Sequence, residues 1–220
     1  MEKITLLYGT GNAGKLAIMR EYLRSIREVE LIGLQDLTYA WKEPEESGKN
    51  PLDNARQKAL GYYRICRRPV FSADSGLYIE GLTPEEQPGV HVRRIAGHSM
   101  TDEEMREYYK NIARRFGGKC IAQYQNAICL VFSEEEIYYS EAPDLSWERF
   151  YLTTDERPQK YAGFPLDAIS TDLKGRHCYD SDSVGAVEED GSGFVRFFRE
   201  ALARHRQVHK EQKNGSIRLD

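Results

Sequence analysis

Residues 3–26 read KITLLYGTGNAGKLAIMREYLRSI, and they set the architecture of the N-terminal half. Lys3–Tyr8 is a short, mostly apolar run, which is typical of a buried strand. From Lys15 onward, apolar residues recur at the three- and four-residue spacing of a helix. A glycine-rich loop, Gly9–Lys15, separates the two patterns. The segment therefore predicts a strand, a tight loop and a helix.

The rest of the chain alternates strands and helices up to residue 118 and then turns to strands. Asn50 before Pro51 is typical of a helix N-cap, and Thr101 with Glu104 forms a capping box. This order predicts a mixed α/β sheet with an inserted or appended antiparallel portion. The remaining predicted elements are a strand at 29–34, a helix from Asn50 to about Tyr63, a strand from Pro69 that breaks at 73–76, a helix from Thr101 to 117–118, strands between Lys119 and about Leu152, and a helix from Ser192 to about His209.

Composition bounds the class of protein. The 220 residues are 40% hydrophobic, with 8 Pro and 18 Gly, which excludes a wholly disordered or fibrous chain. No window approaches the roughly 18 apolar residues of a membrane-spanning helix, and the N-terminus has no basic leader. We therefore expect a cytoplasmic protein that does not bind membranes. Residues 1–210 should form one α/β domain, and residues 211–220 a flexible tail.

Charge and cysteine content exclude further classes. A formal net charge of -4 supplies no broad attraction for a polyanionic backbone, so nucleic acid is not expected as a partner. The 4 cysteines form no CxxC pair, so they predict neither a zinc site nor a redox motif. The net charge does not exclude a small phosphate ligand, because such a ligand needs only a few local cations.

The loop after the first strand is a candidate phosphate cradle. Glycines free the backbone NH groups, and a helix N-terminus adds positive potential. The spacing matches neither GxGxxG nor the P-loop, because Leu16 follows Lys15. As phosphate ligands, the backbone NH groups would act with the Thr10 hydroxyl, the Asn12 amide and the Lys15 ammonium. The alternative is a simple connection between strand and helix.

Acidic residues supply a second candidate site. Asp74, predicted at the mouth of a buried strand, must be exposed to a cleft or paired. With Glu46 it could hold Mg²⁺, which favours one or two carboxylates together with substrate phosphates and water. The alternative is that Glu43–Glu46 is a solvated loop and Asp74 forms a turn. Lys58, on the following helix, is by default a solvent-facing lysine.

Histidine and serine give two further hypotheses. His205 and His209 are spaced i,i+4 on the last helix and could pair on a metal, but coincidence on a surface helix is the simpler interpretation. Ser75, His91 and Asp74 could be assembled into a catalytic triad, but no GxSxG nucleophile elbow supports it.

Five short segments carry a resemblance to a known family. They are residues 10–15 (TGNAGK), residues 45–58 (EESGKNPLDNARQK), residues 72–77 (SADSGL), residues 88–94 (PGVHVRR) and residues 163–167 (GFPLD). In this order they resemble the TGNxxK, EE[ST]G...[ED]NAxxKA, DDSGL, PGxxSAR and GFGYDP motifs of the non-canonical purine NTP pyrophosphatases, also called inosine triphosphate pyrophosphatases.

The resemblance implies a long mixed β-sheet flanked by helices, in two lobes with a central cleft, and a homodimer. It implies Mg²⁺-dependent hydrolysis of a nucleoside triphosphate, in the ribo or deoxy form, to the monophosphate and pyrophosphate. Residue by residue, it assigns Thr10, Asn12, Lys15 and Lys58 to the triphosphate, Ser75 to substrate contact, Glu46 and Asp74 to Mg²⁺, Asp74 also to activation of the attacking water, and Phe164 and Asp167 to the nucleobase.

The sequence departs from the family pattern mainly where the base would bind. Ala73 replaces the first Asp of DDSGL, and Pro165 and Leu166 replace Gly and Tyr of GFGYDP. The family's SHR before the last helix has no counterpart, since residues 180–186 read DSDSVGA. We therefore expect altered base preference, with Lys174, Arg176 or His177 as candidate replacements.

The sequence leaves three functions open. The retention of Lys15, Lys58, Glu46 and Asp74 together favours the pyrophosphatase, because binding alone needs no water-activating carboxylate. The main alternative is a nucleotide-binding protein without strong turnover that acts as a sensor or partner subunit. A hydrolase with Ser75 as nucleophile is the third.

Overall fold

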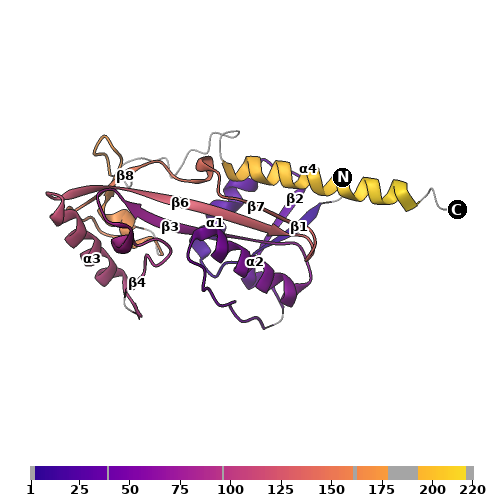
Figure 1. The fold of residues 1–220 in the computed structure, drawn as a ribbon, viewed down its shortest axis with the longest axis horizontal. Coiled ribbons are helices and arrows are strands. Elements are labelled where there is room, and N and C mark those ends of the chain that lie inside the picture. The colour runs from indigo at the N-terminus through magenta and orange to yellow at the C-terminus, as the bar shows by residue number, and fades with distance from the viewer. Residues whose placement is uncertain (1–2, 39, 96, 161–162, 178–192, 217–220) are drawn as a thin grey trace.

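Strands β3 (Val70–Ile79) and β6 (Lys119–Val131) form one long antiparallel ladder, which runs from the pair Val70–Val131 to the pair Ile79–Ala122. Figure 1 shows this ladder running through the molecule, with α3 at one end and α1, α2 and α4 grouped toward the other. The computed structural model describes residues 3–38, 40–95, 97–160, 163–177 and 193–216.

The main sheet has 7 strands in the order β2-β1-β3-β6-β8-β9, with β7 also paired to β6. β1 is parallel to β2 and β3, and the other pairs are antiparallel, so the predicted mixed α/β sheet is confirmed. The other elements are β1 (Ile4–Tyr8), α1 (Ala13–Leu23), β2 (Val29–Gly33), α2 (Pro51–Cys66), β4 (Arg94–Ile95), β5 (His98–Ser99), α3 (Asp102–Arg115), β7 (Ile137–Ser140), β8 (Phe150–Thr153), β9 (Ser170–Thr171) and α4 (Gly193–Ser216).

The two faces of the ladder carry different helices, because successive side chains of a strand point to opposite faces. On one face, α1 and α4 cover the β1 end through residues such as Phe71 and Phe198, whose rings lie 4.8 Å apart. On the same face, α3 covers the far end through Tyr109 and Leu77. On the opposite face, α2 packs Ala59 against the ladder.

The predicted caps of α2 and α3 are confirmed by their hydrogen bonds. The Asn50 side chain accepts a hydrogen bond of 2.8 Å from the backbone NH of Asp53, and Pro51 begins α2. Thr101 and Glu104 form the reciprocal capping box that opens α3. These caps satisfy NH groups that have no partner within the helix.

Two sequence predictions, a break within one strand and the end of the last helix, are wrong. The break at residues 73–76 does not occur: β3 is continuous, because Asp74, Ser75 and Gly76 pair with successive residues of β6. Asp74 therefore lies inside the strand and not at its mouth. The last helix continues to Ser216, beyond the predicted end near His209. Within the described ranges, no helix combines the length and apolar character needed to cross a membrane.

Candidate active site

The end of β1 opens a gap beside β3. β1 pairs with β3 at two positions, the second being Tyr8 with Phe71, and the chain then leaves the sheet at Gly9 and enters α1 at Ala13. Residues 73–75 of β3 therefore run past the loop that leads into α1. Because side chains alternate along the strand, Asp74 faces α2, and its two neighbours face the other side of the sheet.

A cluster of opposite charges lies on the α2 side of the gap. The Lys58 Nζ lies 2.5 Å from the Glu46 Oε1 and 3.9 Å from the Asp74 Oδ1. The Lys58 and Asp74 side chains are mostly buried, with 14% and 11% of their surface exposed. The expectation of a solvent-facing Lys58 is therefore wrong, because a buried ammonium needs anionic partners and has two here.

Asn54 organises this cluster. It is buried on α2, where its Nδ2 donates a hydrogen bond of 3.0 Å to the Asp74 Oδ2. Its Oδ1 accepts one of 2.9 Å from the backbone NH of Gly48, which fixes the loop that carries Glu46. One amide thus joins the strand carboxylate to the acidic loop.

Lys15 extends the cluster toward the opposite face of the sheet. Burial lowers the pKa of its ammonium, while the negative charge of Asp74 acts against that shift. Lys58 lowers the pKa further and Glu46 raises it, so these four side chains act on one another electrostatically. The structure therefore brings together Lys15, Glu46, Lys58 and Asp74, four of the residues selected from the sequence.

The loop before α1 is ordered by its own side chains. The Asn12 Oδ1 caps α1 by accepting hydrogen bonds from the backbone NH groups of Gly14 (2.8 Å) and Lys15 (3.1 Å). The Thr10 hydroxyl accepts a hydrogen bond of 3.2 Å from the backbone NH of Asn12. The Asn12 amide oxygen is thus occupied by the helix cap. The Asn12 Nδ2 lies beside Gly163, and both residues line a cavity that is described below.

A cavity of about 300 Å³ lies on the other face of the sheet, between the α1/α4 and α3 clusters. Its floor is the β3–β6 ladder, where Ser75 is opposite Asn126. Phe164 lies so close to Gly14 that an added Cβ would come 2.4 Å from its ring. The predicted base-contacting residues Phe164 and Asp167 both line this cavity, as do Asn12, Lys15 and Ser75.

Burial raises the pKa of the Asp167 carboxyl to about 6. The group therefore changes between a hydrogen-bond donor and an acceptor within the range of ordinary assay pH. A carboxyl with this property in a cavity is a candidate for ligand recognition.

Several cavity residues were missed by sequence reasoning. Arg93 lines the cavity, whereas Arg94, the residue matched to the family motif, is exposed in β4. The Arg93 Nη1 lies 2.7 Å from the Asp102 Oδ1 and donates a hydrogen bond of 3.1 Å to the Met100 carbonyl. A one-residue shift in the motif would have found it. The lining residues that carried no local signal include five aromatic ones: Tyr8, Tyr22, Tyr124, Trp147 and Phe194.

The candidate replacements for base recognition do not line the cavity. Arg176 pairs with Asp172 at 2.7 Å on an exposed turn, and Lys174 lies on the same turn. His177 is buried, with its Nε2 3.1 Å from the Ala168 carbonyl oxygen. Residues 180–186, which stand in place of the family's SHR, lie outside the described residues.

The geometry does not assemble the serine triad. Ser75 and Asp74 point to opposite faces of β3, since they are consecutive in a continuous strand. His91 is exposed to solvent.

A cavity of ligand size beside a cluster of lysines and carboxylates is typical of an α/β protein that binds a phosphorylated small molecule. The sequence profile of the Ham1 family matches residues 6–142, more than half of the chain, and the protein belongs to this family.

Curated relatives agree with this membership, and a solved structure agrees with the fold. The chain is 30% identical over 190 residues to a dITP/XTP pyrophosphatase of Rhodopseudomonas palustris, with 84% of each chain covered. It is 36% identical over 100 residues to a dITP/XTP pyrophosphatase of Bdellovibrio bacteriovorus, covering 45% of this chain and 49% of that one. A HAM1 protein from Coxiella burnetii has the same fold, with a TM-score of 0.64, 23% identity and coverage of 94% and 99% of the two chains.

Proposed function

We propose that this protein is a nucleoside triphosphate pyrophosphatase that hydrolyses a non-canonical purine NTP or dNTP to the monophosphate and pyrophosphate. The convergence of Lys15, Lys58, Glu46 and Asp74 beside the cavity is the observation that carries the proposal. Phosphoryl transfer depends mainly on positioning and charge neutralisation, and this cluster supplies both signs of charge. The names of the curated relatives support the same reaction.

The donor set suits Mg²⁺. Glu46 and Asp74 are two oxygen-donating carboxylates gathered around one ammonium, and Mg²⁺ prefers one or two carboxylates, water and substrate phosphates. We propose that these two residues hold the ion. When bound, Mg²⁺ would neutralise part of the triphosphate charge and help to orient it.

The side chains then have separate roles in the proposed reaction. Lys15 and Lys58 bind phosphate oxygens, with the loop at Thr10 and Asn12 beside them. Asp74, held in position by Asn54, accepts a proton from the attacking water. The water oxygen forms a bond to the α-phosphorus, the bond to the bridging oxygen breaks, and pyrophosphate leaves with that oxygen.

The cavity would hold the base and sugar. Phe164 offers an aromatic face that any base can stack on, and Asp167 offers a polar group that selects among bases. Ser75 on the cavity floor would contact the substrate. Arg93, which the family motif did not identify, adds a cation to the cavity wall. It would take part in recognition of the base or the sugar.

A substrate panel tests the proposal. ITP, XTP, dITP and the ordinary NTPs and dNTPs are incubated with the protein and Mg²⁺, and monophosphate, pyrophosphate and inorganic phosphate are quantified. We expect monophosphate and pyrophosphate in equal amounts, and loss of both with EDTA. Release of inorganic phosphate, or binding without any turnover, would contradict it, and the latter would favour the sensor alternative.

The homodimer and the cytoplasmic location stay predictions. Both follow from the family resemblance and composition. Sedimentation equilibrium of the purified chain tests the first, because a mass of one chain at micromolar concentration would contradict it.

A further inference from the structure

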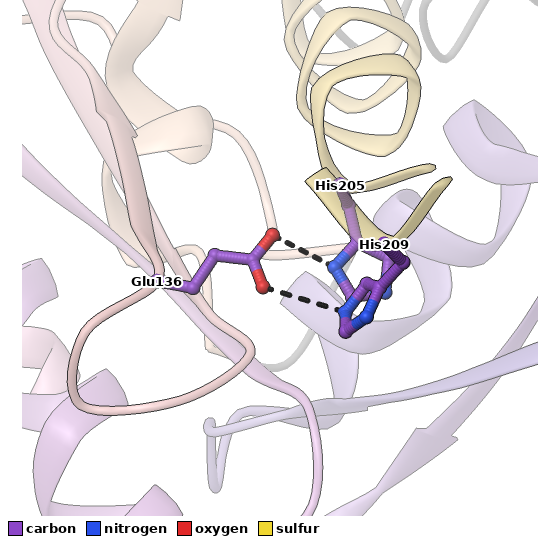
Figure 2. Close-up of side chains that lie close together, drawn as sticks. All are labelled: Glu136, His205 and His209. Atoms are coloured by element: carbon purple, nitrogen blue, oxygen red, sulfur yellow. Dashed lines mark hydrogen bonds and ion pairs between the residues drawn. The ribbon is translucent and has the colours of Figure 1, made fainter. Parts of the chain in front are cut away.

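A second cluster of metal-ligand side chains lies away from the cavity, where α4 passes the hairpin between β6 and β7. Figure 2 shows Glu136 of the hairpin pointing at His205 and His209 of α4. The His205 Nδ1 lies 2.8 Å from the Glu136 Oε1, and the His209 Nε2 lies 3.8 Å from the Glu136 Oε2. Their i,i+4 spacing puts the two histidines on one face of the helix.

The spacing of the ligand atoms fits one small ion. One atom from each of the three residues can be chosen so that all lie within 4.8 Å of one another. Bonds of about 2.0–2.1 Å at the tetrahedral angle put two zinc ligands about 3.4 Å apart. The separations of 2.8 Å and 3.8 Å between Glu136 and the two histidines lie on either side of that value, and the separation between the two imidazoles is within 4.8 Å.

The two inner ligands are held in place by their surroundings. The His205 ring stacks on Phe132 with centroids 3.8 Å apart and an interplanar angle of 10°. The Tyr138 hydroxyl donates a hydrogen bond of 2.9 Å to the Glu136 Oε1. His205 and Glu136 each have 18% of their side chain exposed, while His209 has 52% exposed. Such supporting contacts fix ligand orientation, and the exposed histidine leaves a path for an ion.

We propose that Glu136, His205 and His209 form a binding site for a divalent transition-metal ion of the zinc type, separate from the candidate active site. Two imidazoles and one carboxylate are the donors that Zn²⁺ accepts in three-ligand sites, with water at the fourth position. Mg²⁺ is excluded from this role by its preference for oxygen.

The site joins two segments that are far apart in the sequence. Its ligands come from the β6–β7 hairpin and from the C-terminal half of α4. An ion bound here would stabilise the contact between the helix and the hairpin, because it binds the folded arrangement and the unfolded chain does not hold the three ligands together. The rival explanation is a set of ion pairs between protonated histidines and Glu136 that needs no metal.

Zinc binding to the purified full chain tests the proposal. The protein is stripped with chelator, supplied with excess Mg²⁺ to occupy the proposed active-site carboxylates, and titrated with Zn²⁺ against a chromogenic chelator. We expect one tight equivalent in the parent and at least tenfold weaker binding in His209→Gln. This variant changes the most exposed ligand, so the fold should persist. His91→Gln, which changes an exposed histidine outside the cluster, is the matched control and should bind as the parent does.

Two further readouts separate this site from the cysteines and from the ion-pair explanation. Co²⁺ should give visible absorption in the parent without the intense ultraviolet band of thiolate ligation, and Glu136→Gln should weaken that absorption. Zn²⁺ should raise the thermal unfolding midpoint of the parent and of His91→Gln but not that of His209→Gln. Equal zinc affinity in parent and His209→Gln, a thiolate spectrum, or no tight equivalent would each overturn the proposal.

Discussion

Asn54 donates a hydrogen bond of 3.0 Å to Asp74 and so ties α2 to the middle of β3. Asn54→Ala should lower kcat at least tenfold, because the Asp74 carboxylate loses the contact that orients it, and should cost about 1–3 kcal/mol of stability through unpaired buried groups. Urea unfolding and steady-state kinetics measure the two effects. Asn50→Ala, on the same helix, removes a cap worth about 1 kcal/mol and should leave kcat unchanged. Equal loss of kcat in both variants would mean that Asn54 acts through stability alone.

Asp74→Asn should abolish hydrolysis while nucleotide still binds. The amide is nearly isosteric and can still accept the hydrogen bond from Asn54, but it cannot take a proton from water or hold Mg²⁺ strongly. We expect kcat to fall by at least about 10² to 10⁴-fold, the scale of a positioned base. Single-turnover assays and nucleotide titrations measure both effects. Asp144→Asn, in a surface ion pair with Arg196, is the control and should keep parental turnover. Turnover within threefold of the parent would remove Asp74 from the mechanism.

Triphosphate binding should weaken at alkaline pH because of Lys15. Burial lowers the pKa of this ammonium, so its charge is lost at a lower pH than that of an ordinary lysine. Affinity should therefore fall as pH rises through the lowered pKa. Calorimetry across the alkaline range measures this fall.

Lys15→Arg keeps its charge over the same range and should remove the pH dependence, and Lys15→Ala should remove it together with much of the affinity. Lys49→Arg, an exposed lysine on the acidic loop, should behave as the parent does. An alkaline fall that persists in Lys15→Ala would assign the titration to another group.

The parts of the fold that adjacent residues determine were predictable from the sequence. Asn50 with Pro51, and Thr101 with Glu104, act within one helical turn, so their patterns identified α2 and α3 correctly. The alternation of strands and helices likewise predicted the mixed sheet. These signals need no knowledge of what packs against them.

Features decided by distant residues were not predictable in the same way. Asp74, Ser75 and Gly76 have the composition of a turn, but pairing with β6 keeps them in a strand. The buried position of Lys58 depends on Glu46 and Asp74, which come from a loop and a different strand. The family motif matches Arg94, but Arg93 lines the cavity. Which of two adjacent arginines faces inward depends on how the chain packs, and the motif does not contain that information.

Asp167 should make stability depend on pH. The pKa of its carboxyl is raised from the ordinary value of 3.8 to about 6 in the folded protein. Between these two pH values the folded protein therefore binds more protons than the unfolded chain. The free energy of unfolding should therefore fall as pH rises through this window. Urea unfolding at several pH values, with Asp167→Asn compared with the parent, isolates the contribution. The variant should lose this fall, and Asp144→Asn should keep it. An unchanged profile in Asp167→Asn would place the titration elsewhere.

Gly14→Ala should disturb the cavity without weakening the helix. Ala is a better helix former than Gly by about 1 kcal/mol, so α1 should be as stable or more stable. The new methyl group would come 2.4 Å from the Phe164 ring and must displace it. If Phe164 stacks on the base, Gly14→Ala and Phe164→Ala should each raise KM for every nucleotide by similar factors. The double variant should then match Phe164→Ala alone, because the methyl group acts through a ring that is no longer present. Additive losses in kcat/KM would mean that the methyl group contacts the nucleotide directly, and a base-selective loss in Phe164→Ala would rule out simple stacking.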